Sequence, residues 1–189
     1  MSGVRSPLFG KRTEVLLCCV ACSFQEEPIA LAPSIHIICF GNLLSGDDGF
    51  GIHVYHRLLL ETFPTEVKIF DAGLMGLSAL SLFDDCDVAV VIDAVLSQGD
   101  IGHVHTLPLS AFRSPVDAFS AHALDLHHLF HLLPVLHDGT PPKTLVIGAE
   151  IEPPSGTFSM ALSVKLVPAV EAAVVEIKKV LQEYLPACL

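Results

Sequence analysis

The chain has 189 residues, of which 51% are hydrophobic and 16% are charged, and its formal net charge is −11. This hydrophobic content is sufficient for a buried core and excludes a disordered chain. The acidic balance disfavours both nucleic acid and anionic membranes as partners, because no basic patch is present. No apolar run reaches the roughly 18 residues that a transmembrane helix needs.

The first 34 residues lack the regular hydrophobic period of the rest of the chain. A short apolar run at 15–22 follows three basic residues, as in a secretory signal peptide, but no clear cleavage site follows it. We therefore interpret residues 1–34 as an N-terminal extension outside the core fold and residues 35–189 as a single α/β domain. The six cysteines do not form a disulfide framework, which favours a reducing, cytoplasmic location.

From residue 35 onward, strands and helices are expected to alternate, which is typical of a largely parallel sheet. Five strands are predicted, at 35–40, 67–71, 88–93, 102–107 and 144–149. Four helices are predicted, at 51–63, 77–83, 121–133 and about 167–184, with Pro64 and Pro134 ending the first and the third. The third strand is apolar from Val88 to Ile92, so it should be covered on both faces. The predicted fold class is α/β: a three-layer sandwich with a mostly parallel, twisted, five-stranded sheet and helices on both faces.

The most informative motif lies between the first predicted strand and the first predicted helix. It reads Gly-Asn-Leu-Leu-Ser-Gly-Asp-Asp-Gly-Phe-Gly over residues 41–51. Glycine allows the backbone to adopt positive φ and to approach a ligand closely. The adjacent acids Asp47 and Asp48 would repel a phosphate, and the glycines are not in the order of a dinucleotide-binding loop. The loop therefore favours a cation, and a metal ion is the leading candidate.

Two further aspartates end the neighbouring predicted strands, Asp71 the second and Asp93 the third. Ligands of open parallel sheets bind at the carboxyl ends of the strands, so these acids should share one edge with Asp48. An ionised Asp93 directly after five apolar residues is unfavourable unless it is paired or bound to metal. The alternative is that Asp93 accepts a hydrogen bond from a loop amide. For Asp71, a structural role in the turn that follows it is an equal alternative.

Histidines are concentrated in the third predicted helix. Ser120 is a candidate N-cap that would place His122 in the first turn, at the same edge as Asp48 and Asp93. Two carboxylates and one imidazole, with open positions left over, suit a transition metal. His127 and His131 are four residues apart, a spacing at which both could bind one metal ion. The H-E-x-x-H pattern is missing, however, and we expect a solvated helical face there.

These motifs, taken in order, resemble the hydrogenase maturation proteases, the endopeptidases that trim the large subunit of [NiFe] hydrogenases. The residues that carry the resemblance are Gly41-Asn42-x-Leu44-x-x-Asp47-Asp48-Gly49-x-Gly51, Asp71-Ala72-Gly73, Asp93-Ala94, Ser120-x-His122 and Glu152-Pro153. The resemblance runs from about residue 35 to residue 181. It implies a nickel-recognising site made of Asp48, Asp93 and His122, with Asp48 at a position where some members carry glutamate.

The resemblance also implies a substrate, the precursor of a [NiFe]-hydrogenase large subunit whose C-terminal extension is removed after nickel insertion. Nickel would then arrive with the substrate, and no organic cofactor is implied. We expect a cytoplasmic, monomeric, metal-dependent endopeptidase that binds neither nucleic acid nor a membrane. Two alternatives stay open: a non-catalytic nickel chaperone or scaffold for hydrogenase assembly, because no nucleophile is recognisable, and a hydrolase with zinc at His127 and His131.

Overall fold

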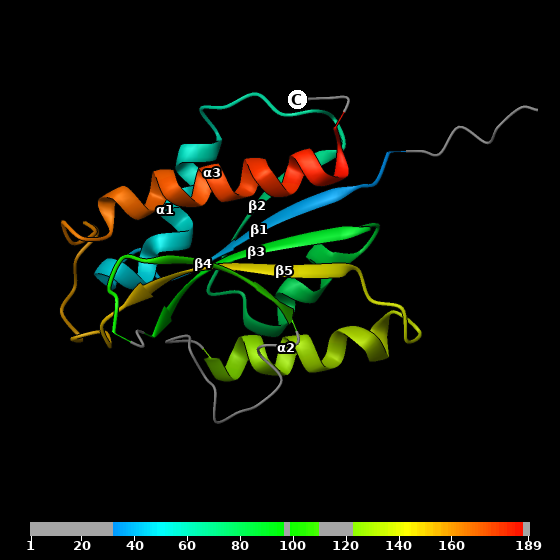
Figure 1. Ribbon diagram of the computed structural model, residues 1–189. Coiled ribbons are helices and arrows are strands. Elements are labelled where there is room, and N and C mark those ends of the chain that lie inside the picture. The colour runs from blue at the N-terminus through cyan, green and yellow to red at the C-terminus, as the bar shows by residue number, and fades with distance from the viewer. Residues whose placement is uncertain (1–31, 97–98, 110–122, 187–189) are drawn as a thin grey trace, which may run out of the picture. The chain divides into compact units, whose positions relative to one another are not determined.

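The structure, a computed structural model, describes residues 32–96, 99–109 and 123–186 (Figure 1). The strands are β1 (Ile35–Phe40), β2 (Val67–Gly73), β3 (Val88–Leu96), β4 (Val104–Pro108) and β5 (Lys143–Ile151). The α-helices are α1 (Phe50–Leu58), α2 (Ala123–Leu136) and α3 (Val167–Tyr184), and two 3₁₀ helices are η1 (Gly46–Gly49) and η2 (Gly76–Phe83). Our division of the chain at residue 34 stays a prediction, because residues 1–31 lie outside the described part.

The five strands form one sheet in the order β2-β1-β3-β5-β4. Strands β2, β1, β3 and β5 are mutually parallel, and β4 pairs with β5 in the antiparallel direction. The central strand β3 is buried from Val88 to Val95, as its continuous apolar run predicts. The predicted mostly parallel, five-stranded sheet is confirmed.

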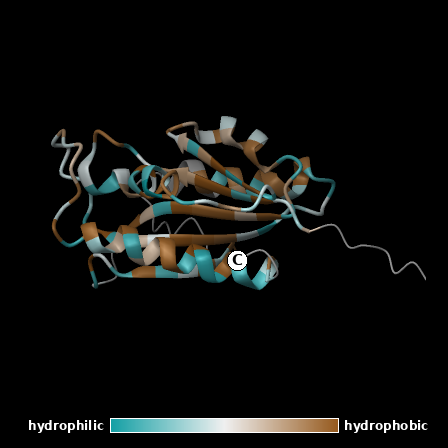
Figure 2. Cartoon of the chain, turned by 90° about the horizontal axis from the view of Figure 1, so that it is seen from above, coloured by the Kyte–Doolittle hydropathy of each residue, from teal (hydrophilic) through white to brown (hydrophobic). Residues whose placement is uncertain are grey.

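Helices cover both faces of this sheet (Figure 1). Alternate residues such as Ile37, Val90 and Ile92 point to the face that α1 and α3 cover. The residues between them, such as Ile38 and Val91, point to the face that η2 and α2 cover. Figure 2 shows the strands as mainly hydrophobic, with hydrophilic residues on the helices and loops. The predicted three-layer α/β sandwich is therefore confirmed.

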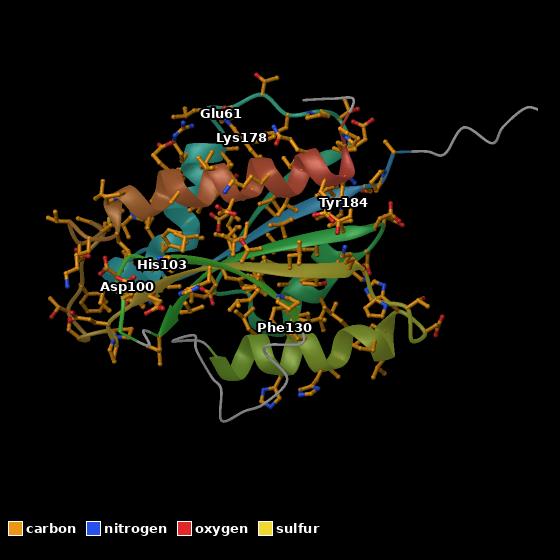
Figure 3. The ribbon with its side chains drawn as sticks, in the orientation of Figure 1. Glu61, Asp100, His103, Phe130, Lys178 and Tyr184 are labelled. Atoms are coloured by element: carbon orange, nitrogen blue, oxygen red, sulfur yellow. The ribbon has the colours of Figure 1, made fainter. Side chains whose placement is uncertain are left out.

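Charged side chains join the two helices on the first face. Lys178 of α3 donates a 2.9 Å hydrogen bond to Glu61 (Figure 3), and Arg57 of α1 donates a 2.6 Å bond to Glu171 of α3. Arg57 also donates to Glu61 at 2.8 Å. The hydrogen bonds from Lys178 and Arg57 lower the pKa of the Glu61 carboxyl.

Two of the predicted helix ends were wrong. Helix α1 ends at Leu58 and not at residue 63, because Leu60 and Glu61 form tighter i→i+3 bonds that close its last turn. Helix α2 continues past Pro134 to Leu136. Pro134 lies in the last turn, where a missing backbone donor interrupts little of the helix. Among the described helices none is long and apolar enough to cross a membrane.

Candidate functional site

The loop after β1 folds back against its own 3₁₀ helix. Gly41 has a φ of 139°, and a Cβ at this position would lie 2.5 Å from the carbonyl oxygen of Asp48. The amide of Asn42 donates a 3.1 Å hydrogen bond to the same oxygen. Only glycine fits here, since a side chain would displace the residue that carries the candidate ligand.

The start of α1 lies directly on the ends of two strands. A Cβ on Gly51 would overlap the carbonyl oxygen of Phe40 at the end of β1 and would lie 2.8 Å from that of Ile92 in β3. This close approach seats η1 and α1 at the carboxyl edge of the sheet. Asp48, which is three residues before Gly51, and Asp93, which follows Ile92, therefore belong to the same edge.

Asp48 and Asp93 are the two buried aspartates of this edge. Asp48 is 3% exposed and Asp93 is 1% exposed. Asp93 alternates with Ala89 and Val91 along β3, which places it on the face that η2 and α2 cover. Buried carboxylates are stable as ions only with hydrogen bonds, counter-charges or a metal. Their burial at the ligand-binding edge of the sheet makes them the strongest candidates for function.

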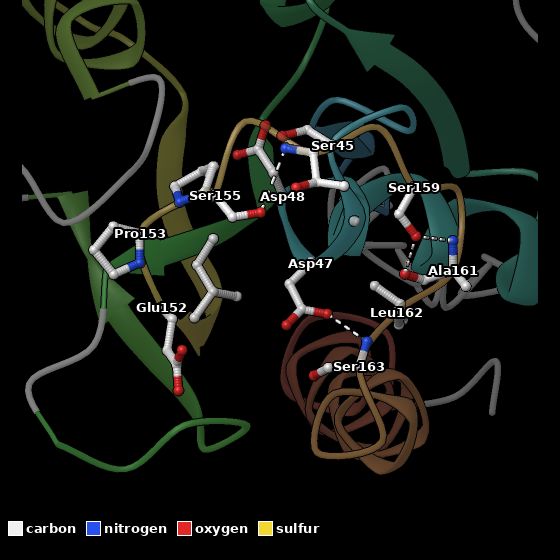
Figure 4. A pocket seen from close by; sticks show the side chains of 14 residues that line it. Ser45, Asp47, Asp48, Glu152, Pro153, Ser155, Ser159, Ala161, Leu162 and Ser163 are labelled. Carbon is white, nitrogen blue, oxygen red and sulfur yellow. Dashed lines mark hydrogen bonds between the residues drawn. The ribbon is translucent and has the colours of Figure 1, made fainter.

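Asp47 has a different position from its neighbour Asp48. Its Oδ1 accepts a 2.6 Å hydrogen bond from the amide of Ser163, which lies just before α3. Figure 4 shows the Asp47 side chain pointing toward Ser163, whereas the Asp48 carboxyl group points away from it. Asp47 therefore attaches η1 to the segment before α3, whereas the side chain of Asp48 is buried at the edge of the sheet.

Asp71 is not brought to the buried pair. It lies inside β2, which continues to Gly73, and its side chain is exposed. It is in register with Cys39, whose side chain packs on the α1 and α3 face, opposite to the face of Asp93. Burial first, and the nearby Asp71 carboxylate second, raise the pKa of the Cys39 thiol far above its usual range.

His122, the third predicted ligand, lies outside the described residues and stays a prediction. Helix α2 begins at the next residue and ends at Leu136. A connection of six residues leads to strand β5, which begins in register with Val88 at the amino edge of the sheet. Helix α2 therefore ends near the amino edge, and its first turn lies toward the carboxyl edge (Figure 1). This direction is the one that a shared site with Asp93 requires.

The described residues do not form a complete metal site by themselves. Among residues 32–96, 99–109 and 123–186, no three histidine, cysteine, aspartate or glutamate side chains are placed to hold a metal ion. His131 is exposed on α2, as expected for a solvated face. His122, the predicted third ligand, is not among these residues.

The sequence prediction missed a buried acid on β5. Glu150 is 4% exposed, and its Oε1 lies 2.7 Å from Nε2 of His105. Its Oε2 accepts a 3.0 Å hydrogen bond from the backbone amide of Asp100. Gly148 of β5 is in register with Asp93 on one side and with His105 on the other. The side chain of Val95 packs over Gly148. This apolar side chain therefore lies between Asp93 and the His105–Glu150 pair. We interpret Glu150 as the group that attaches β4, through His105, and the β3–β4 connection, through Asp100, to β5. A single acid within the apolar run 145–151 was the available signal.

A pocket of about 400 Å³ opens beside Asp48. Three segments line it, namely 45–48 with η1, 151–155 at the end of β5 and 157–163 before α3 (Figure 4). Its polar lining includes Asp47, Asp48 and Glu152 together with several serine side chains. We call this cavity the η1 pocket.

Comparisons with known proteins agree with this architecture. The family model of the hydrogenase maturation protease HycI matches residues 52–183. The hydrogenase expression/formation proteins HupD of Thiocapsa roseopersicina and HoxM of Azotobacter vinelandii are 28% and 29% identical over 148 and 150 residues. Both alignments cover 75% of this chain, and they cover 66% of HupD and 71% of HoxM. A protein of Methanocaldococcus jannaschii is 41% identical over 63 residues, which are 32% of this chain and 41% of that protein.

Solved structures show the same fold. The hydrogenase maturating endopeptidase HybD from E. coli has a TM-score of 0.67 at 24% identity, covering 79% of this chain and 92% of that one. A hydrogenase 2 maturation peptidase from a Thaumarchaeota archaeon has a TM-score of 0.57 at 26% identity, covering 78% and 97%. The fold thus defines an α/β sandwich of the maturation-peptidase class. With a family model that matches most of its length, the chain belongs to the hydrogenase maturation protease family.

Proposed function

We propose that this protein is an endopeptidase that removes the C-terminal extension of a [NiFe]-hydrogenase large-subunit precursor after nickel insertion. Membership of the family supports the proposal, and similar proteins are named as maturation endopeptidases. The observation that carries it is the pair of buried carboxylates, Asp48 and Asp93, at the carboxyl edge of the sheet. We propose further that the protein acts as a cytoplasmic monomer, with the precursor as its partner.

Nickel in this proposal belongs to the substrate. Asp48 and Asp93 would contact it through carboxylate oxygens and His122 through an imidazole nitrogen, a donor set that suits a divalent transition metal with open positions. The burial of both aspartates fits this role, because a cation would balance their charge. A metal held at such a site can polarise a nearby carbonyl group.

The surrounding residues would hold these ligands in place before the substrate arrives. Asp47 attaches η1 to Ser163, and Gly51 seats the start of α1 on the ends of β1 and β3. Both contacts restrict the movement of Asp48 relative to Asp93. Because the site is already ordered, the energy of precursor binding is available to orient the precursor.

The proposal can be tested with purified precursor, prepared with and without nickel, and mass spectrometry of its C-terminus. We expect wild-type protein to shorten the nickel-loaded precursor and to leave the nickel-free one intact. Asp93→Asn should slow cleavage more than about 100-fold, since even outer-shell partners of metal ligands cost 10–100-fold. Asp84→Asn is the matched control, because Asp84 is exposed and follows η2.

Two results would contradict the proposal. A precursor that stays full length while bound to the wild-type protein would favour the nickel chaperone. Undiminished cleavage by the Asp93→Asn variant would remove Asp93 from any essential role, whatever the protein does to the precursor.

A further inference from the structure

Gly148 leaves a space on the sheet face that η2 and α2 cover, at the carboxyl edge. It lies on β5 between Asp93 of β3 and His105 of β4, and it is in register with both. Residues in register on neighbouring strands point to the same face. Because strands lie about 4.8 Å apart, the backbones of Asp93 and His105 are about 10 Å apart, and β5 has no side chain between them.

Glu150 adds a second acid to the border of this space. It is two residues after Gly148 on β5, so it points to the same face, and it is in register with Val95 of β3. Its carboxylate is buried and contacts His105. Four side chains therefore surround the space. Three of them, the carboxylates of Asp93 and Glu150 and the imidazole of His105, are of types that bind transition metals.

Val95, the fourth side chain, fills the space that Gly148 leaves. A Cβ on Gly148 would lie 2.6 Å from Cγ1 of Val95 and 3.2 Å from its Cγ2, and the three heavy atoms nearest to this Cβ all belong to Val95. Ligand atoms lie about 2.0–2.2 Å from a metal ion, so those that share one ion approach within about 4 Å of one another. The methyl groups of Val95 occupy the position that an ion shared by Asp93 and the His105–Glu150 pair would need.

The His105–Glu150 pair is complete without a metal ion. Oε1 of Glu150 lies 2.7 Å from Nε2 of His105 and Oε2 accepts a hydrogen bond from the Asp100 amide, so both oxygens of the buried carboxylate have partners. The side chain of His105 is 37% exposed, so ions in solution have access to it. Val95 is the side chain that separates the pair from Asp93.

We infer that Val95 determines which side chains hold the nickel ion, because it keeps the His105–Glu150 pair away from an ion at Asp93. With the pair excluded, the free protein binds nickel weakly, and nickel leaves with the large subunit. Without Val95, two carboxylates and an imidazole would bind the ion together and retain it on the protein. This inference rests on the proposed function, in which nickel belongs to the substrate.

The test is isothermal titration calorimetry of the full chain with nickel chloride, without precursor. Val95→Ala removes the two methyl groups beside Gly148. We expect this variant to bind nickel at least about tenfold more tightly than the wild type, since even outer-shell partners change metal affinity about 10–100-fold. The gain should disappear when His105→Gln is added, because glutamine keeps a donor for Glu150 and removes the imidazole ligand.

Val91→Ala is the matched control. Val91 is fully buried on the same face of β3, two residues before Asp93, and its neighbour on β5 is Val146 and not a glycine. This variant loses the same two methyl groups and should bind nickel as the wild type does. A Val95→Ala protein that is folded by circular dichroism and has wild-type nickel affinity would overturn the inference.

His105→Gln in the wild-type background is a second test, which does not depend on the folding of Val95→Ala. Unchanged nickel affinity supports the separation of His105 from the ion. A weaker affinity would show that His105 already binds nickel in the presence of Val95, and would overturn the inference.

Cleavage of the nickel-loaded precursor separates this inference from the proposed function. A precursor that stays intact with the wild type, while Val95→Ala gains nickel affinity through His105, contradicts the proteolysis and supports the role of Val95. A precursor that the wild type shortens, while Val95→Ala shows no gain, supports the proteolysis and overturns the role of Val95.

Discussion

Gly51 offers the sharpest test of how the fold supports the site, because two physical effects predict opposite signs for Gly51→Ala. Helix propensity alone favours alanine by about 1 kcal/mol in the interior of a helix. The added Cβ, however, would overlap the carbonyl oxygen of Phe40 and lie 2.8 Å from that of Ile92. Both neighbours are backbone atoms of strands in the interior of the sheet, so neither can rotate away.

Overpacking a well-filled core lowers the free energy of unfolding by about 1–3 kcal/mol. We expect Gly51→Ala to lie at the upper end of this range, because the neighbouring backbone atoms cannot move away. After the gain in propensity, we expect a net loss of about 2 kcal/mol. For a chain of this size, that loss lowers Tm by about 4–8 °C. Thermal unfolding followed by circular dichroism measures it directly.

The control is Gly139→Ala, in the turn between α2 and β5. Gly139 has a φ of 83° and nothing lies within 4 Å of its added Cβ, so alanine there costs only backbone strain of about 1–2 kcal/mol. Gly51→Ala should also slow precursor cleavage, because α1 must move together with η1 and Asp48, whereas Gly139→Ala should not. A Gly51→Ala protein as stable as the wild type would refute the close seating of α1 on the sheet.

Three further predictions follow from single contacts. Asp47→Ala removes the acceptor of the Ser163 amide, which should cost about 1 kcal/mol and accelerate hydrogen exchange at that amide; unchanged exchange would argue against the attachment. Burial raises the pKa of the Cys39 thiol, so iodoacetamide at mildly alkaline pH should label Cys39 only after the protein unfolds. Labelling of Cys39 in the native protein would contradict this prediction. Glu150→Ala removes a buried acceptor from His105 and should cost about 1–3 kcal/mol in urea unfolding, whereas an unchanged midpoint would show that the pair contributes nothing.

Elements with a strong hydrophobic period could be predicted from the sequence. The apolar stripe of α3 predicted Val167–Tyr184, and the apolar run of β1 predicted Ile35–Phe40, both as observed. Elements that depend on distant contacts could not. Strand β5 continues through Glu150 to Ile151, because the buried carboxylate finds a partner in His105, 45 residues earlier in the chain. A charge within an apolar run otherwise indicates the end of a strand.

In the candidate site, too, some features could be predicted from the sequence and others depend on distant contacts. Strand order and chemistry predicted that Asp48 and Asp93 share the carboxyl edge, since parallel strands deliver their ends to one side. The different positions of Asp47 and Asp48 depend on Ser163, 116 residues away, which local sequence does not reveal. Asp71 lies on the opposite face because of its register with Cys39, and that register is set by the sheet as a whole.

The central claim is that Asp48, Asp93 and His122 together bind one nickel ion. Crystals of the protein soaked with nickel, measured at the nickel absorption edge, test it most directly. We predict one anomalous peak within about 2 Å of a carboxylate oxygen of each aspartate and of an imidazole nitrogen of the histidine. A nickel ion held elsewhere, or bound by only one of the three side chains, would contradict the account.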